Sequence, residues 1–159
     1  IMKKIYFASP LFASMEVRYN ASVVADIRSR YQDLEVYLPQ EQGEINDKNA
    51  YANSVMIAKA DTDALLASDI LIAVIDGLSI DAGVASEIGV AYQAGIPIIG
   101  LYTDSRQQGF DNQKKIDALS ELGESQFSYV NLYTVGLIKL NGILVDSEEA
   151  MIEAIQTYL

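Results

Sequence analysis

The chain has 159 residues, half of them hydrophobic, and a net charge of -11 from 11 basic and 22 acidic side chains. This length predicts one domain, residues 1–159, and the acidic surface argues against a nucleic-acid polymer as a partner. The sequence has no cysteine and no histidine, which excludes disulfides, thiolate zinc sites and catalysis by serine–histidine or cysteine–histidine pairs. Acid–base chemistry would have to use carboxylates, tyrosines or lysines.

The apolar run over residues 5–8 is too short for the core of a signal peptide, and no apolar stretch is as long as a membrane span. We therefore expect a cytoplasmic protein that does not interact with a membrane.

Residues 4–8 predict a short buried strand, and residues 15–31 a helix with Val17, Ala21, Val24, Ile27 and Tyr31 on one face. A strand over 35–38 and a loop over 40–49 that could border a site precede a second helix, over 50–67, with the expected core contacts Val55, Ala58, Leu65 and Leu66. Residues 69–75 contain a continuous apolar run, which predicts a strand buried on both faces. A loop over 76–80, a helix over 81–95 and a strand over 96–102 follow. The last elements are a less defined region over 112–122, a helix over 131–140, a strand over 143–145 and a terminal helix over 148–159.

Strands and helices alternate along the whole chain. This pattern predicts an α/β fold, a doubly wound (flavodoxin- or Rossmann-like) parallel sheet of about five strands with helices on both faces. Ligands in such folds bind beyond the carboxyl ends of the strands. Residues 6–12, 76–87 and 102–109 are therefore the segments in which we expect a site.

The densest group of candidate residues, from Asp81 to Gly89, follows a buried strand and opens a helix. Asp81 occupies the N-cap position, and Glu87 lies within the first two turns, where the helix dipole favours an anion. Two nearby carboxyl groups could support glycosyl transfer with retention, one as nucleophile and one handling the proton of the leaving group. The alternative is that Asp81 only caps the helix and Glu87 lies on its solvated face.

The glycines of the chain do not predict a nucleotide cofactor. None forms G-x-G-x-x-G directly after the first strand, which ends in Ala8-Ser9-Pro10.

Five segments, in order and with consistent spacing, resemble those of one family. They are residues 5–12 (IYFASPLF), residues 61–77, the helix Asp81-x-Gly83-x-x-x-Glu87-x-Gly89-x-Ala91, residues 102–106 and Asn131-Leu132-Tyr133. Together they resemble the nucleoside 2-deoxyribosyltransferases over nearly the whole chain.

The resemblance implies a role for each matching residue. Glu87 would attack the anomeric carbon, Tyr6 would hold the Glu87 carboxylate, and Asp61 and Asp81 would contact the base, one of them supplying a proton. Asn131, from a neighbouring subunit, would bind the sugar hydroxyls, and Tyr133 would line the pocket. Gly83 and Phe12 would belong to the substrate-binding residues. The implied partners are 2′-deoxynucleosides and free bases, the implied assembly is a homo-oligomer with shared active sites, and no metal or organic cofactor is required.

Two other functions stay open at this point. A nucleoside or 5′-monophosphate N-glycosidase on the same fold would use the same glutamate and let water collect the sugar. A phosphate cradle, however, needs hydrogen-bond donors, and Ser9 is followed by the apolar Pro10-Leu11-Phe12. A non-catalytic nucleotide-binding module is the second alternative. The sequence does not predict the accepted bases or the number of subunits.

Overall fold

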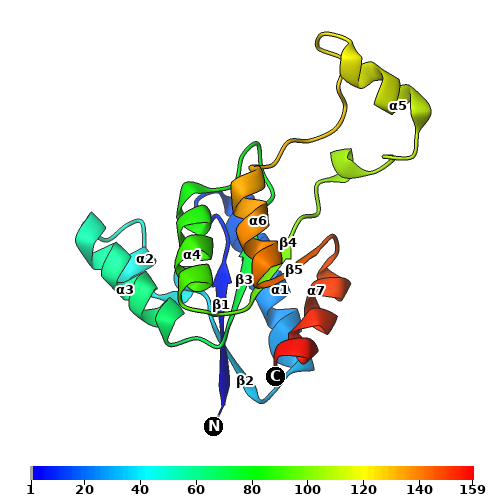
Figure 1. Cartoon of the computed structure of the whole chain (residues 1–159). Coiled ribbons are helices and arrows are strands. Elements are labelled where there is room, and N and C mark those ends of the chain that lie inside the picture. The colour runs from blue at the N-terminus through cyan, green and yellow to red at the C-terminus, as the bar shows by residue number, and fades with distance from the viewer. Residues whose placement is uncertain (1) are drawn as a thin grey trace.

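A single parallel sheet forms the centre of the computed structural model, which describes residues 2–159 (Figure 1). Its strand order is β2-β1-β3-β4-β5. The expected doubly wound fold is confirmed. The strands are β1 (Lys3–Ala8), β2 (Leu34–Tyr37), β3 (Ile70–Val74), β4 (Ile98–Leu101) and β5 (Gly142–Val145). The helices are α1 (Ser14–Arg30), α2 (Gly43–Asn46), α3 (Ser54–Leu66), α4 (Ala82–Gln93), α5 (Gln113–Asp117), α6 (Leu132–Leu140) and α7 (Glu148–Ile155).

The strand order places β1 between β2 and β3, so the chain leaves β1 toward one edge of the sheet and later returns to its other side. Tyr6 of β1 pairs in register with Tyr37 of β2 and with Leu71 of β3. The reversal of strand order beside β1 is the topological switch point at which doubly wound folds bind ligands. Any site at this point therefore takes residues from the carboxyl ends of β1 and β3.

The core has two layers, one on each face of the sheet. Side chains of α1 and α7 cover one face, together with the Ile5 and Phe7 side of β1. Side chains of α3, α4 and α6 cover the other face, together with Tyr6 and Ala8. Alternation along β1 thus sends Tyr6 toward α4, whereas its neighbours in sequence point to α1.

Parts of the predicted helix faces are wrong. In α1, Val17 and Ala21 are exposed, and the buried face consists of Asn20, Val23, Val24 and Ile27. In α3, Leu65 alone is buried; Val55 and Leu66 are 73% and 53% exposed, and Ala58 is exposed. The reason is placement: the N-terminal half of α3 extends past the edge of the sheet (Figure 1), so the apolar residues there have no layer to pack against.

Two boundaries also differ from expectation. Helix α3 begins at Ser54, four residues later than predicted, because Asn53 caps it by accepting a hydrogen bond from the Met56 amide at 2.8 Å. The stretch 40–49, expected to be a loop, contains a 3-10 turn (Pro39–Glu41) and the single-turn helix α2.

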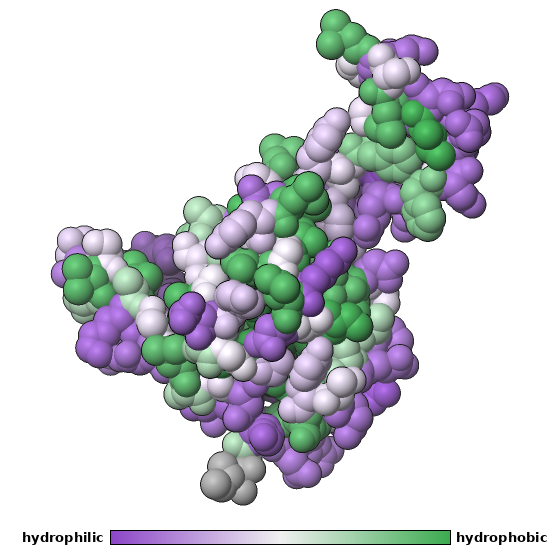
Figure 2. Space-filling model, in the orientation of Figure 1, coloured by the Kyte–Doolittle hydropathy of each residue, from purple (hydrophilic) through white to green (hydrophobic). Residues whose placement is uncertain are grey.

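The connection from β4 to α6 leaves the body of the molecule. Figure 1 shows residues 104–130, here called the arm, reaching away from the sheet with α5 at their far end. Figure 2 shows hydrophobic residues on its surface. Its strongly exposed apolar side chains are Phe110, Leu119, Leu122 and Tyr129. Within residues 2–159, no helix has both the length and the apolar character needed to cross a membrane.

Candidate active site

Helix α4 follows β3 at the carboxyl end of the sheet. Its first residue is Ala82, because the preceding Asp81 caps the helix. The Asp81 Oδ2 atom accepts a hydrogen bond from the Val84 amide at 3.1 Å. The structure thus shows the plain capping geometry expected for this aspartate. Glu87 follows on the same helix, half-buried, on the side that packs toward Tyr6 of β1.

Tyr6 and Glu87 form the centre of the site. Tyr6 is fully buried, and its hydroxyl has no hydrogen-bond partner. The Glu87 carboxyl is close enough to shift its pKa: burial and then the Glu87 charge raise the pKa of Tyr6 well above its usual range. Tyr6 is therefore a neutral donor whose hydroxyl is free to hold the carboxylate of Glu87.

The environment of Glu87 disfavours its negative charge. Burial raises the pKa of Glu87 to about 7; the Tyr6 hydroxyl opposes the shift, and the charges of Asp61 and Asp81 reinforce it. A carboxyl with such a pKa exists in both protonation states near neutral pH. Glu87 is therefore not on the solvated face of α4, and carboxyl groups with a pKa shifted in this way are frequent at functional sites.

Asp61 of α3 is the second carboxyl of the cluster. Its Oδ1 atom is buried and has no hydrogen-bond partner. Burial raises the pKa of Asp61, whereas the Asn46 amide and the Lys48 charge lower it. The structure therefore brings Tyr6, Asp61 and Glu87 together from three elements, with Asp81 close enough to act on Glu87 electrostatically.

Gly83 and Phe12 lie close to Asp81 and Lys48, the two charged residues that act on this cluster. A Cβ atom on Gly83 would come within 3.1 Å of the Asp81 Oδ2 atom, so the glycine leaves space for the capping carboxylate. Phe12 is 68% exposed in the loop between β1 and α1, with the Lys48 ammonium 5.4 Å from its ring centre.

Asn131 and Tyr133 are not brought together with Glu87 within one chain. Asn131 caps α6, accepting hydrogen bonds from the Thr134 amide at 3.0 Å and the Thr134 hydroxyl at 3.2 Å. Tyr133 is 76% exposed and lines a hollow with Ala85, Gly89 and Tyr92 of α4. By helical periodicity these α4 residues lie on the face opposite Glu87.

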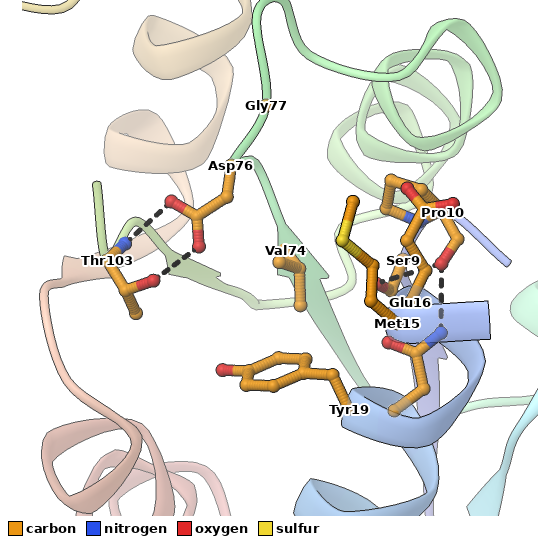
Figure 3. Close-up of a pocket in the computed structure, with 10 residues that line it drawn as sticks. Ser9, Pro10, Met15, Glu16, Tyr19, Val74, Asp76, Gly77 and Thr103 are labelled. Carbon is orange, nitrogen blue, oxygen red and sulfur yellow. Dashed lines mark hydrogen bonds between the residues drawn. The ribbon is translucent and has the colours of Figure 1, made fainter. Parts of the chain in front are cut away.

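A separate crevice of about 380 Å³ lies at the same edge of the sheet, on the α1 side (Figure 3). In the wall of this crevice, hydrogen bonds connect the residues that follow β3 with those that follow β4. The Asp76 carboxylate accepts hydrogen bonds from the Thr103 amide at 2.7 Å and the Thr103 hydroxyl at 2.6 Å, and also from the Asp104 amide at 3.0 Å. Ser9, Met15 and Tyr19 also line this crevice.

Sequence reasoning missed three residues of the site. Tyr37 stacks on Tyr6, and Asn46 and Lys48 act on Asp61. Tyr37 lies within the predicted strand 35–38, near its carboxyl end, where a site was expected. Asn46 and Lys48 lie in the stretch 40–49, which was expected to border a site, but its sequence did not single out these two residues. Among residues 2–159, no three acidic side chains are grouped so as to hold a metal ion.

The comparisons with known proteins identify the family and the fold of the chain. The family model described as nucleoside 2-deoxyribosyltransferase matches residues 5–153, and the chain belongs to this family. A solved structure of a conserved protein from Enterococcus faecalis V583 is 62% identical, with a TM-score of 0.94 and 100% coverage of both chains.

Two more distant structures support the fold alone. The 2-deoxyribosyltransferase from Bacillus psychrosaccharolyticus is 18% identical, with a TM-score of 0.62 and coverage of 94% of this chain and 90% of that one. A CMP N-glycosidase from Clostridium botulinum is 21% identical, with a TM-score of 0.51 and coverage of 99% and 100%. No curated protein matches the chain. The family and the fold indicate an enzyme of the nucleoside deoxyribosyltransferase type.

Proposed function

We propose that the protein transfers a 2-deoxyribosyl group between purine or pyrimidine bases through a covalent intermediate on Glu87. The observation that carries the proposal is the convergence of Tyr6, Asp61 and Glu87 at the switch point, with the pKa of Glu87 raised by burial to about 7. Membership of the family supplies the substrate class.

In the first step, a carboxylate oxygen of Glu87 forms a bond to the anomeric carbon as the bond from that carbon to the base nitrogen breaks. The bonding pair leaves with the base, which takes a proton from the carboxylic acid of Asp61 or Asp81. The developing positive charge on the sugar is stabilised by the carboxylate that then captures it. The Tyr6 hydroxyl would hold the second oxygen of Glu87 in line.

In the second step, a nitrogen of the incoming base attacks the anomeric carbon and displaces the Glu87 carboxylate. The proton that this nitrogen loses returns to the aspartate, so the enzyme ends in its starting state. Both steps balance with the chain's own carboxyl groups, and neither requires an added cofactor.

Asn131 and Tyr133 take part only if they come from another copy of the chain. Within one chain both residues line hollows beside Ala85, on the face of α4 opposite Glu87. We propose a homo-oligomer in which the start of α6 from one subunit completes the sugar site of another.

Mixing two inactive variants, Glu87→Gln and Asn131→Ala, tests this arrangement. If sites are shared, mixed oligomers contain sites with both intact residues and regain exchange activity. Absence of any recovery, with mixed oligomers shown to form by native mass spectrometry, would contradict it.

Hydrolysis is the alternative reaction of the same carboxyl group, with water as the acceptor. A 5′-monophosphate substrate is disfavoured, because Ser9 is followed by the apolar Pro10-Leu11-Phe12, which offers few hydrogen-bond donors to a phosphate. Acidic neighbours around Glu87 would repel a phosphate.

The deciding experiment incubates the protein with 2′-deoxyinosine and excess adenine, and separates the products by liquid chromatography. Deoxyadenosine and hypoxanthine should appear together, and Glu87→Gln should abolish both. Hypoxanthine with free deoxyribose would instead identify a hydrolase. If no product forms from purine donors, pyrimidine donors or deoxynucleoside monophosphates, the protein is a binding module and the proposal is wrong.

A further inference from the structure

Asn46 is a buried polar residue that the proposed reaction does not yet use. It is the last residue of α2, a single helical turn that packs against α3, and only 6% of its surface is exposed. Its Nδ2 atom is buried and has no hydrogen-bond partner. Buried amide groups are nearly always hydrogen-bonded, so an unpartnered one beside a site requires an explanation.

Its counterpart is the carboxyl of Asp61. Oδ1 of Asp61 is likewise buried and without a hydrogen-bond partner. Oδ2 of the same carboxyl is not among the buried, unpartnered atoms. Helices α2 and α3 pack together, and the Asn46 amide is close enough to the Asp61 carboxyl to lower its pKa, although no hydrogen bond joins the two side chains in the structure. The pairing is complementary: one atom carries N–H groups, and the other has free lone pairs.

The other groups that face this carboxyl come from each element around it. Lys48, which follows α2, places a positive charge near it. The negative charge of Asp61 raises the pKa of Tyr6 of β1, of Tyr37 of β2 and of Glu87 of α4. Of these neighbours, the tyrosines are neutral and Glu87 repels a second negative charge, so Asn46 and Lys48 are the groups that favour the anion.

We propose that Asn46 is a positioning residue for Asp61: its amide holds the buried oxygen Oδ1 and leaves Oδ2 facing the base. The inference rests on the proposed function for the identity of the base as ligand. The closeness of the two side chains does not depend on that function. Asn46 fixes the direction of the carboxyl group that exchanges a proton with the base. Together with Lys48, it also opposes the rise that burial causes in the pKa of Asp61.

The first test requires no substrate. Carbon-detected nuclear magnetic resonance follows the titration of the Asp61 carboxyl in the wild-type protein and in Asn46→Leu, which fills similar space without a donor. Loss of the donor should move the Asp61 midpoint upward by about one pH unit. Asn46→Ser, which keeps a hydroxyl donor, should move it less.

Asn141→Leu is the matched control, since Asn141 also has a buried Nδ2 atom without a partner but caps the far end of α6. It should leave the Asp61 midpoint unchanged. If Asn46→Leu does not fold, Asn46→Ala removes the same donor with a smaller side chain. A midpoint that stays fixed in every folded Asn46 variant would show that Asn46 only fills space and would overturn the proposal.

The second test measures base exchange as a function of pH. If Asp61 donates the proton to the departing base, Asn46→Leu should lower kcat roughly tenfold and shift the high-pH limb of kcat/KM upward, with partial rescue by Asn46→Ser. A fall in kcat with an unmoved limb, or no rescue by serine, would overturn the positioning role. If the wild-type protein exchanges no bases, the proposed function fails, and the titration still decides the Asn46–Asp61 pairing.

Discussion

The ring of Tyr6 stacks on the ring of Tyr37, with centroids 5.1 Å apart and planes inclined by 24°. This contact joins neighbouring strands and fixes the ring whose hydroxyl serves Glu87. The ring and the hydroxyl of Tyr6 therefore have different roles, and separate substitutions can test each role. The ring supports the packing of β1, and the hydroxyl acts on the carboxyl of Glu87.

Tyr6→Phe should therefore keep the fold and weaken the chemistry. Loss of the hydroxyl removes the interaction that lowers the pKa of Glu87, so this pKa should rise above about 7. The low-pH limb of kcat/KM, which requires ionised Glu87, should shift to higher pH, and activity at pH 7 should fall roughly tenfold. Tyr37→Phe keeps the stacked ring and is the control. The low-pH limb of its kcat/KM profile should stay where it is in the wild-type protein. An unshifted limb in Tyr6→Phe would exclude the holding role.

The raised pKa of Glu87 also predicts how stability depends on pH. Its value is 4.5 in an ordinary environment and about 7 in the fold, so the folded protein holds the proton more tightly than the unfolded chain. Stability is therefore lost as pH rises from 4.5 to 7, since the buried carboxyl must ionise. Glu87→Gln removes this cost and should stabilise the protein by up to about 3 kcal/mol at pH 8 and by almost nothing at pH 4.

Urea unfolding at both pH values measures this difference. Glu124→Gln, at an exposed glutamate, is the control for the loss of one negative charge. A stability gain of equal size at pH 4 and pH 8 would mean that packing, and not ionisation, is the cause.

Asp76 should be important for stability at the edge of the sheet. Its carboxylate accepts three hydrogen bonds from Thr103 and Asp104 and so joins the ends of β3 and β4. Asp76→Asn replaces one acceptor oxygen with a donor and should cost about 1–3 kcal/mol of unfolding free energy. Thr103→Val removes only the hydroxyl bond and should cost less. Denaturant midpoints check both, and equal stability of Asp76→Asn and wild type would contradict this account.

Gly83 and Gly89 offer a matched pair on α4. A Cβ atom at Gly83 meets the Asp81 carboxylate at 3.1 Å, whereas at Gly89 it meets nothing within 4 Å. Gly89→Ala should stabilise the helix by up to about 1 kcal/mol and leave kcat/KM unchanged. Gly83→Ala should gain less stability and lower kcat/KM, because it displaces the capping carboxylate next to Glu87. Equal effects of the two substitutions on both readouts would show that the contact with Asp81 is unimportant.

The alternation of strands and helices was predictable because each element carries its own periodicity. The apolar run before Asp76 indicated a strand buried on both faces, and β3 is buried throughout. The exposure of Val17 and Val55 was not predictable, since it depends on where a helix lies relative to the sheet. Sequence periodicity gives the apolar face of a helix but does not show whether a layer covers it.

The same distinction applies to the site. Glu87 and Asp81 lie in one short motif, and Tyr6 lies near the end of a predicted strand. Their places at the carboxyl ends of predicted parallel strands indicated that they could meet. Asn46 reaches Asp61 only because α2, a single turn, is held against α3 by tertiary packing. Isolated turns of this length have no independent stability, and their sequences carry little signal.

The central position of β1 has a consequence for the order of folding. Tyr6 meets Asp61 and Glu87 only after β1 has paired with β3, a contact that closes a long loop of chain. Non-local strand pairing of this kind is slow compared with helix formation. The acid cluster therefore cannot exist in a chain whose helices alone have formed, and the approach of Tyr6 to Glu87 reports the pairing of β1 with β3 during refolding.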